Sequence, residues 1–144
     1  MNHPHSFPPR RIGRMARWHR LTTYTLLALC ALSGLAWFVG LDLLDLPPPR
    51  LRLCWVLHGI TALAATLAIG AAVPQHALMT WRAHRNRTAG AVLGATLALV
   101  VLSALCLQYG LEDWHDAGHW VHVAVGIAVG IVFPWHIWWA RSRS

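Results

Sequence analysis

The sequence predicts an all-α membrane protein, an up-down four-helix transmembrane bundle with both termini cytoplasmic. Three observations predict it. The 144-residue chain is 56% hydrophobic and only 12% charged, its apolar residues fall in four long runs, and its charged residues lie outside those runs. A soluble domain carries about twice this share of charged residues. We therefore expect one membrane domain over 17–144, preceded by a disordered basic tail over 1–16.

The four apolar runs cover about 21–40, 53–80, 90–109 and 117–140. Each is long enough to span a membrane, because about 20 helical residues cross a hydrocarbon core of ~30 Å. Only a helix satisfies the backbone of a lone segment in lipid. Short connections make successive spans antiparallel neighbours. Pro74 and Pro134 lie inside the second and fourth runs and are expected to kink them.

The arginines gather on one side of these runs, and only Arg50 and Arg52 lie on the other. Those before the first run, after the second and at the end of the chain are Arg10, Arg11, Arg14, Arg17, Arg20, Arg82, Arg85, Arg87, Arg141 and Arg143. All five acidic residues lie in the first and third connections, so the positive-inside rule places both termini in the cytoplasm. Nucleic-acid binding is not expected, because the arginines flank the spans at intervals and form no single basic patch.

Histidines inside the spans are the candidate functional residues, since ionisable groups in a membrane are costly. His122 and His136 are 14 residues apart, which returns them to within about 40° of one helix face at a separation of ~21 Å. Counted from the outer ends of the spans, His122 lies about 8 Å deep and His58 about 9 Å. His58 and His122 can therefore face each other.

His136 has two candidate partners near the cytoplasmic side. By the same count His136 lies about 28 Å deep, His19 about 31 Å and His76 about 36 Å. Depth favours His19, while a kink at Pro74 could lift His76 to the level of His136.

Paired imidazoles on facing helices, without nearby carboxylates or thiolates, fit haem iron better than zinc or a carboxylate-bridged di-metal site. The sequence therefore predicts two haem b groups that pass electrons, because two histidine ligands leave no open coordination position on the iron. Glycines that would let the backbone approach a flat macrocycle are Gly34, Gly59, Gly94 and Gly126. Candidate partners of the haem propionates are Arg17, Arg20, Arg50 and Arg52.

These residues resemble the cytochrome b (gamma) subunits of membrane-bound formate dehydrogenases and nickel-iron hydrogenases, and related bacterial di-haem cytochromes b. The similarity runs over nearly the whole chain beyond the tail. The matching residues are Arg17-Trp18-His19, Ser33-Gly34-Leu35, Leu57-His58, His122, Gly126 and His136. Asn86-Arg87-Thr88-Ala89-Gly90 is similar to an Asn-Ala-Gly segment of the formate dehydrogenase subunit, with Arg87 and Thr88 intervening.

The resemblance implies an outer haem between His58 and His122 and an inner haem between His19 and His136. It also implies a quinone site beside the inner haem, formed with His136 by Asn86, Thr88, Ala89 and Gly90. The expected partners are the lipid bilayer, quinone and a periplasmic redox protein of the dehydrogenase or hydrogenase type. The expected location is the bacterial inner membrane, and self-association into a homo-oligomer is left open.

The function expected from these residues is electron transfer between that periplasmic partner and the quinone pool. A first alternative is a stand-alone quinone-linked oxidoreductase such as a superoxide oxidase, although the acidic outer rim would repel an anionic substrate. A second alternative is a non-redox membrane anchor whose histidines only form hydrogen bonds between helices. Haem content per chain distinguishes the anchor from the other two.

Overall fold

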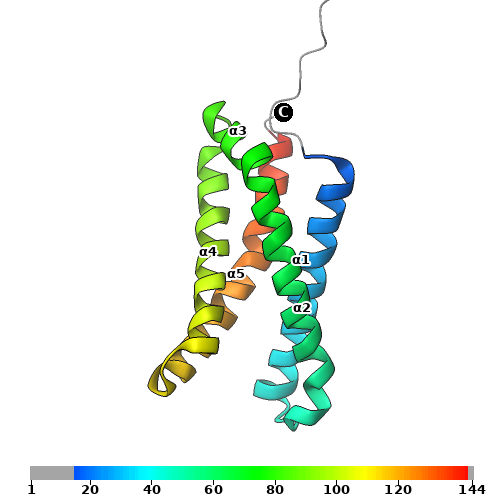
Figure 1. The fold of residues 1–144 in the computed structure, drawn as a ribbon, viewed down its shortest axis with the longest axis vertical. Helices are drawn as coiled ribbons and strands as arrows, with labels where there is room; N and C mark the ends of the chain where they lie inside the picture. Colours follow the sequence, from blue (N-terminus) through cyan, green and yellow to red (C-terminus); the bar gives the residue numbers. More distant parts are fainter. Residues whose placement is uncertain (1–14, 143–144) are drawn as a thin grey trace, which may run out of the picture.

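The computed structural model describes residues 15–142, and every element within that range is helical (Figure 1). The elements in chain order are α1 (Arg17–Phe38), the π-helix η1 (Val39–Leu43), α2 (Pro48–Ala72), the π-helix η2 (Val73–Ala77), α3 (Leu78–Arg82), α4 (Arg87–Tyr109), the 3-10 helix η3 (Glu112–Trp114) and α5 (His115–Ser142). The expected tail over 1–16 falls outside the described residues except for its last two.

Four stretches are long and apolar enough to cross a membrane: Arg17–Leu43, Pro48–Arg82, Arg87–Tyr109 and Glu112–Ser142. They confirm the predicted class and indicate a multi-pass membrane protein. Each stretch contains its predicted run and extends beyond at least one end of it. The second begins earlier than the run because Pro48 occupies the first helical position, where a fixed φ and a missing N–H suit a helix start.

The four spans form two helical hairpins. α1 packs along α2, and α4 packs along α5, whereas contacts between the hairpins are few and run mainly between α1 and α5. The start of α1 and the end of α5 lie at the same end of the bundle (Figure 1). We name this end the arginine-rich end, because the arginines near 17–20, 82–87 and 141 belong to it, and the opposite end, with Asp42 and Asp116, the acidic end.

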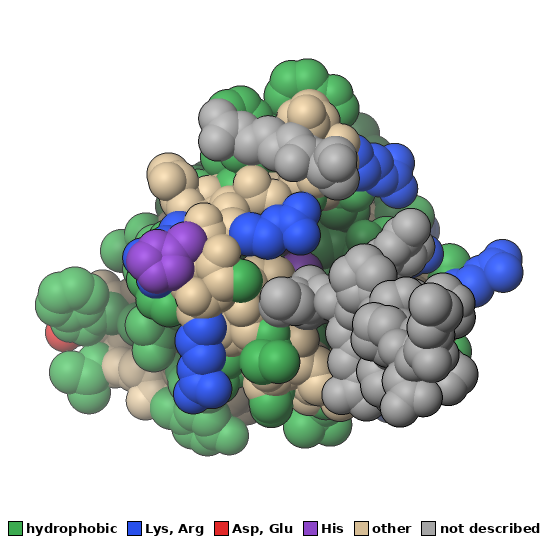
Figure 2. Space-filling model, turned by 90° about the horizontal axis from the view of Figure 1, so that it is seen from above, with side chains coloured by type: hydrophobic (Ala, Val, Ile, Leu, Met, Phe, Trp, Pro, Cys, Tyr) green, Lys and Arg blue, Asp and Glu red, His purple; other side chains and the backbone are tan. Residues whose placement is uncertain are grey.

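The sides of the bundle are apolar. Large side chains on α2 such as Leu63 and Leu67 are 66% and 67% exposed, as expected for helices whose outer face is solvated by lipid. Seen from the arginine-rich end, Arg side chains lie over the end face and hydrophobic side chains surround it (Figure 2). The few buried residues are mostly small or hydroxyl-bearing, such as Ala65, Ala89 and Ser103, which is the composition that lets membrane helices approach closely.

The two intramembrane prolines behave differently. Pro74 lies in the π-helical segment η2, where the regular α-helical hydrogen-bond pattern of α2 is interrupted, as the missing N–H of proline requires. Pro134 lies inside α5, which is helical from His115 to Ser142 without interruption. The sequence predicts a kink at both prolines. The helix type changes at Pro74 and does not change at Pro134.

Candidate functional site

Two pairs of histidine rings face each other between the hairpins. Near the acidic end, His58 of α2 and His122 of α5 have ring centroids 6.1 Å apart, with ring planes at 85°. Near the arginine-rich end, His76 of η2 and His136 of α5 have centroids 6.3 Å apart, with planes at 90°. We name these the outer pair and the inner pair. Each takes one ring from the second span and one from the fourth.

The His58 ring is fixed by α1. Its Nδ1 lies 2.9 Å from the backbone carbonyl oxygen of Cys30. A carbonyl only accepts, so Nδ1–H donates, and the lone pair of this neutral ring is on Nε2. Gly34 lies against the same ring edge, where a Cβ would stand 2.7 Å from Cε1 and 2.8 Å from Nδ1 of His58. Glycine is therefore the residue that lets α1 approach this ring.

The His122 ring is fixed by α4 in an equivalent way. Its Nδ1 lies 2.9 Å from the Ser103 hydroxyl, which itself donates to the Val100 carbonyl oxygen at 2.9 Å. Because the single hydroxyl proton is engaged with Val100, the hydroxyl accepts from Nδ1–H of His122. Both rings of the outer pair thus donate from Nδ1 to the other helix of their own hairpin and keep Nε2 as the acceptor atom.

The two centroid separations match a metal ion held between two imidazoles. Imidazoles on opposite sides of one metal ion have ring centroids about 6.2 Å apart, because each metal–nitrogen bond is about 2.0 Å long. Nδ1–H bonded to a second residue is also the usual arrangement of a metal-bound histidine. The outer pair shows both features.

The kind of metal follows from the number of side chains that converge. Within residues 15–142 there is no group of three or more His, Cys, Asp or Glu side chains that could hold a metal ion. A protein zinc site needs three or four such ligands, whereas a porphyrin supplies four donors to its iron and leaves only the axial positions to the protein. Two isolated imidazole pairs therefore fit haem and do not fit zinc.

His136 carries a further sign of an incomplete environment. Its Nδ1 is buried and has no hydrogen-bond partner among the described residues, although buried polar atoms are nearly always paired. The backbone of Ala89, at the start of α4, lies beside this ring. A bound molecule at this place could satisfy the Nδ1 atom.

His19 does not face His136. Its Nε2 donates to the Ala68 carbonyl oxygen at 2.8 Å, and its ring, 7% exposed, is stacked on Trp18 with centroids 5.3 Å apart. The ring that contacts His136 in the structure is that of His76, the alternative partner left open by the depth count. The depth count that favoured His19 assumed a regular α-helix through Pro74. In the structure Pro74 and His76 instead lie in the π-helical segment η2.

Glycines along the spans differ in surroundings. Of the four expected to admit a macrocycle, only Gly34 has a close neighbour. A Cβ added to Gly59, Gly94 or Gly126 would meet nothing within 4 Å. Packing among the described residues does not require glycine at these three positions, and the space beside each could receive a cofactor or lipid.

The residues expected at a quinone site lie at the turn into α4. Asn86 is the N-cap of α4 in the left-handed conformation with φ of 50°, Ala89 is buried, Thr88 is exposed and Gly90 half-buried. The backbone of Ala89 lies beside the His136 ring. The expected propionate partners Arg17, Arg20, Arg50 and Arg52 lie at the span ends, Arg20 half-buried and the others exposed.

Sequence reasoning missed three contributors. Cys30 supplies the carbonyl oxygen that holds His58, and Ser103 holds His122. Ser103 is the one serine in the 90–109 run, which is a signal that could have identified it. The third is a hydrogen bond at the acidic end, where Nε2–H of His119 donates to Oδ1 of Asp42 at 3.0 Å. It joins η1 to α5 and hence the first hairpin to the second.

Comparison with known proteins yields no relative. No protein-family model, curated protein or solved structure matches this chain.

Proposed function

We propose that this protein is a membrane cytochrome with two b-type haems that carries electrons across the bilayer. The observation that supports the proposal is the presence of two imidazole pairs between the hairpins, the outer pair with a centroid separation of 6.1 Å and the inner pair with one of 6.3 Å. A hydrogen-bonding pair of neutral histidines would have a nitrogen of one ring bonded to the other. In the outer pair both Nδ1 atoms instead bond outside the pair.

In this proposal His58 and His122 are the axial ligands of the outer haem, and His76 and His136 those of the inner haem. His19, the partner of His136 that the family resemblance implies, is the alternative inner ligand. Haem iron bound in this way supplies one-electron transfer without an open coordination position. Cys30 and Ser103 would hold the two outer rings through their Nδ1 atoms and so fix their tautomers.

Electrons would enter or leave at the acidic end through a periplasmic redox partner, and at the arginine-rich end through quinone. The location in a bacterial inner membrane belongs to the same proposal. An enzyme that oxidises superoxide alone is less well supported, because carboxylates such as Asp42, Glu112, Asp113 and Asp116 gather at the acidic end and repel an anion.

The test is a spectrum followed by a reaction. Protein purified in detergent should show the reduced-minus-oxidised spectrum of a b-type haem. The dithionite-reduced protein, freed of excess reductant, should be reoxidised anaerobically by a short-chain quinone. Protein that folds, takes up haem and is not reoxidised by any quinone would contradict the quinone-linked role, and protein without haem would contradict the whole proposal.

A further inference from the structure

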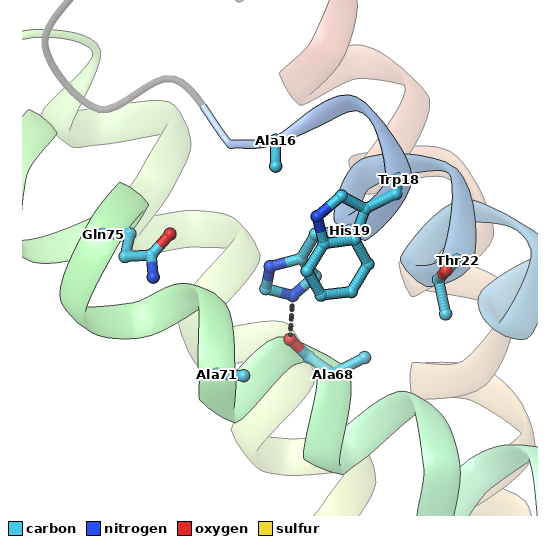
Figure 3. A pocket seen from close by; sticks show the side chains of 7 residues that line it. All are labelled: Ala16, Trp18, His19, Thr22, Ala68, Ala71 and Gln75. Carbon is cyan, nitrogen blue, oxygen red and sulfur yellow. Dashed lines mark hydrogen bonds between the residues drawn. The ribbon is translucent and has the colours of Figure 1, made fainter.

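A pocket lies between α1 and α2 at the arginine-rich end, outside the space between the hairpins. It has a volume of about 250 Å³ and is lined by Ala16, Trp18, His19, Thr22, Ala68, Ala71 and Gln75 (Figure 3). None of the predicted quinone-site residues at the start of α4 lines it. We propose that this pocket binds the headgroup of a membrane quinone, a proposal that rests on the quinone-linked function above.

The lining favours a flat, uncharged ligand. Ala68 and Ala71 are one turn apart on α2 and leave a shallow floor, while Trp18 supplies an exposed indole stacked at 23° on the His19 ring. An indole face offers a stacking surface to a planar ring. No lining residue is Arg, Lys, Asp or Glu, so nothing in the pocket compensates the charge of an anionic lipid headgroup.

Polar groups stand where quinone carbonyls would need donors. The Gln75 amide is exposed and extends from η2 toward the His19 ring (Figure 3). Its NH₂ can donate to a carbonyl oxygen, as can the hydroxyl of Thr22. The His19 Nε2–H is already engaged with the Ala68 carbonyl, so His19 forms a wall of the pocket and is not the donor.

The size admits a headgroup without its tail. Pockets that enclose drug-sized ligands measure about 300–1,000 Å³, so 250 Å³ holds a single substituted ring. The isoprenoid tail would remain in the lipid beside α1 and α2, whose outer faces are apolar. A quinone can therefore enter from the bilayer without crossing polar surface.

The pocket also adjoins the proposed inner haem. Gln75 and His76 are consecutive residues of η2, so a residue of the pocket wall and a proposed ligand of the inner iron share one π-helical turn, with their side chains pointing in different directions. Short π segments inside longer helices frequently occur at functional sites. Here η2 places a pocket residue and a candidate ligand side by side.

The experiment measures binding and reduction separately, in nanodiscs of phosphatidylcholine that contain the full chain. Binding of a short-chain ubiquinone is measured as quinone retained per chain, and reduction as the rate of haem reoxidation against quinone concentration. Gln75→Leu should raise both the dissociation constant and the half-saturating concentration about tenfold, the loss of one good hydrogen bond. Ala71→Leu should raise both values further, because the larger side chain would fill part of the pocket.

Matched variants make the result decisive. Leu67→Phe, on an exposed position of α2, is the matched control and should leave binding unchanged. Thr88→Val tests the competing quinone site at the start of α4. Unchanged binding in both Gln75→Leu and Ala71→Leu, or a large loss in Thr88→Val alone, would overturn the pocket. Binding that follows Gln75 in a chain without haem would support the pocket while the two-haem function fails. Displacement of quinone by vesicle phosphatidylglycerol but not by excess quinone analogue would identify a lipid site and overturn the proposal.

Discussion

The outer and inner histidine pairs have nearly the same ring separation but are held differently. In the outer pair, each ring bonds through Nδ1 to the other helix of its own hairpin, at Cys30 and Ser103. In the inner pair, Nδ1 of His136 is buried without a partner among the described residues, and His76 lies in a π-helical segment. The outer pair is therefore preorganised for a ligand. The inner pair has an environment that a bound molecule would complete.

The largest effect is expected when one histidine of a pair is removed. His122→Ala should reduce haem b from two per chain to one, because the outer iron loses an axial ligand while the inner pair is untouched. Haem is measured by the pyridine haemochrome method against protein concentration. His115→Ala, an exposed histidine on the same helix, is the control and should keep both haems. Full haem content in His122→Ala would contradict the outer site.

The inner pair is tested by replacing each of the two histidines that could be the second ligand beside His136. His76→Ala should lose one haem, whereas His19→Ala should keep both, because Nε2–H of His19 is already donated to Ala68. The haem content of the two variants is compared after identical purification. The reverse result would restore the pairing of His19 with His136 that the family resemblance implies.

A smaller effect is expected from crowding the outer pair. Gly34→Ala would place a Cβ 2.7 Å from Cε1 of His58, and the hydrogen bond to Cys30 prevents the ring from moving freely. Disturbing the residues that orient a metal-ligating histidine typically lowers metal affinity by about 10–100-fold. The occupancy of the outer haem should therefore fall. Haem retention during dilution measures this. Gly70→Ala, whose Cβ would meet nothing within 4 Å, should retain haem as the wild type does.

The smallest expected effect concerns how the outer ligand is tuned. Ser103→Ala removes the acceptor of the His122 Nδ1–H, which makes the imidazole a weaker donor to iron and disfavours the oxidised form. The midpoint potential of the outer haem should rise by about 20–40 mV, the equivalent of roughly 0.5–1 kcal/mol for one electron. Redox titration measures this rise, and Ser103→Thr should restore the wild-type value. A potential that stays constant or falls would show that Ser103 does not tune the ligand.

The same comparison shows how far sequence reasoning extends. Four apolar runs predicted four spans, because length and hydropathy alone decide whether a helix can cross a bilayer. The meeting of His58 with His122 was predicted because both lie in regular helix near the acidic end, where counting residues gives depth directly. The facing of His76 and His136 was left open, since Pro74 changes the helix type by an amount that counting cannot supply.

Contacts across neighbouring helices were the least predictable. The bond from His122 to Ser103 depends on how α4 is rotated against α5, and the bond from His58 to the Cys30 backbone depends on how closely α1 approaches at Gly34. The sequence of a single helix predicts neither its rotation against a neighbouring helix nor the distance between the two helices. Small residues mark where such approaches are allowed, but they do not show which ring fills the space.

The central claim is that each imidazole pair between the hairpins holds one haem, and the most direct test is haem b per folded chain. Wild-type protein should contain two haems. The double variant His58→Ala/His76→Ala, which removes the α2 and η2 member of each pair, should contain none while keeping the wild-type helical circular dichroism. A wild-type chain that folds in the presence of excess haem and binds none, or a double variant that still binds two, would contradict the account.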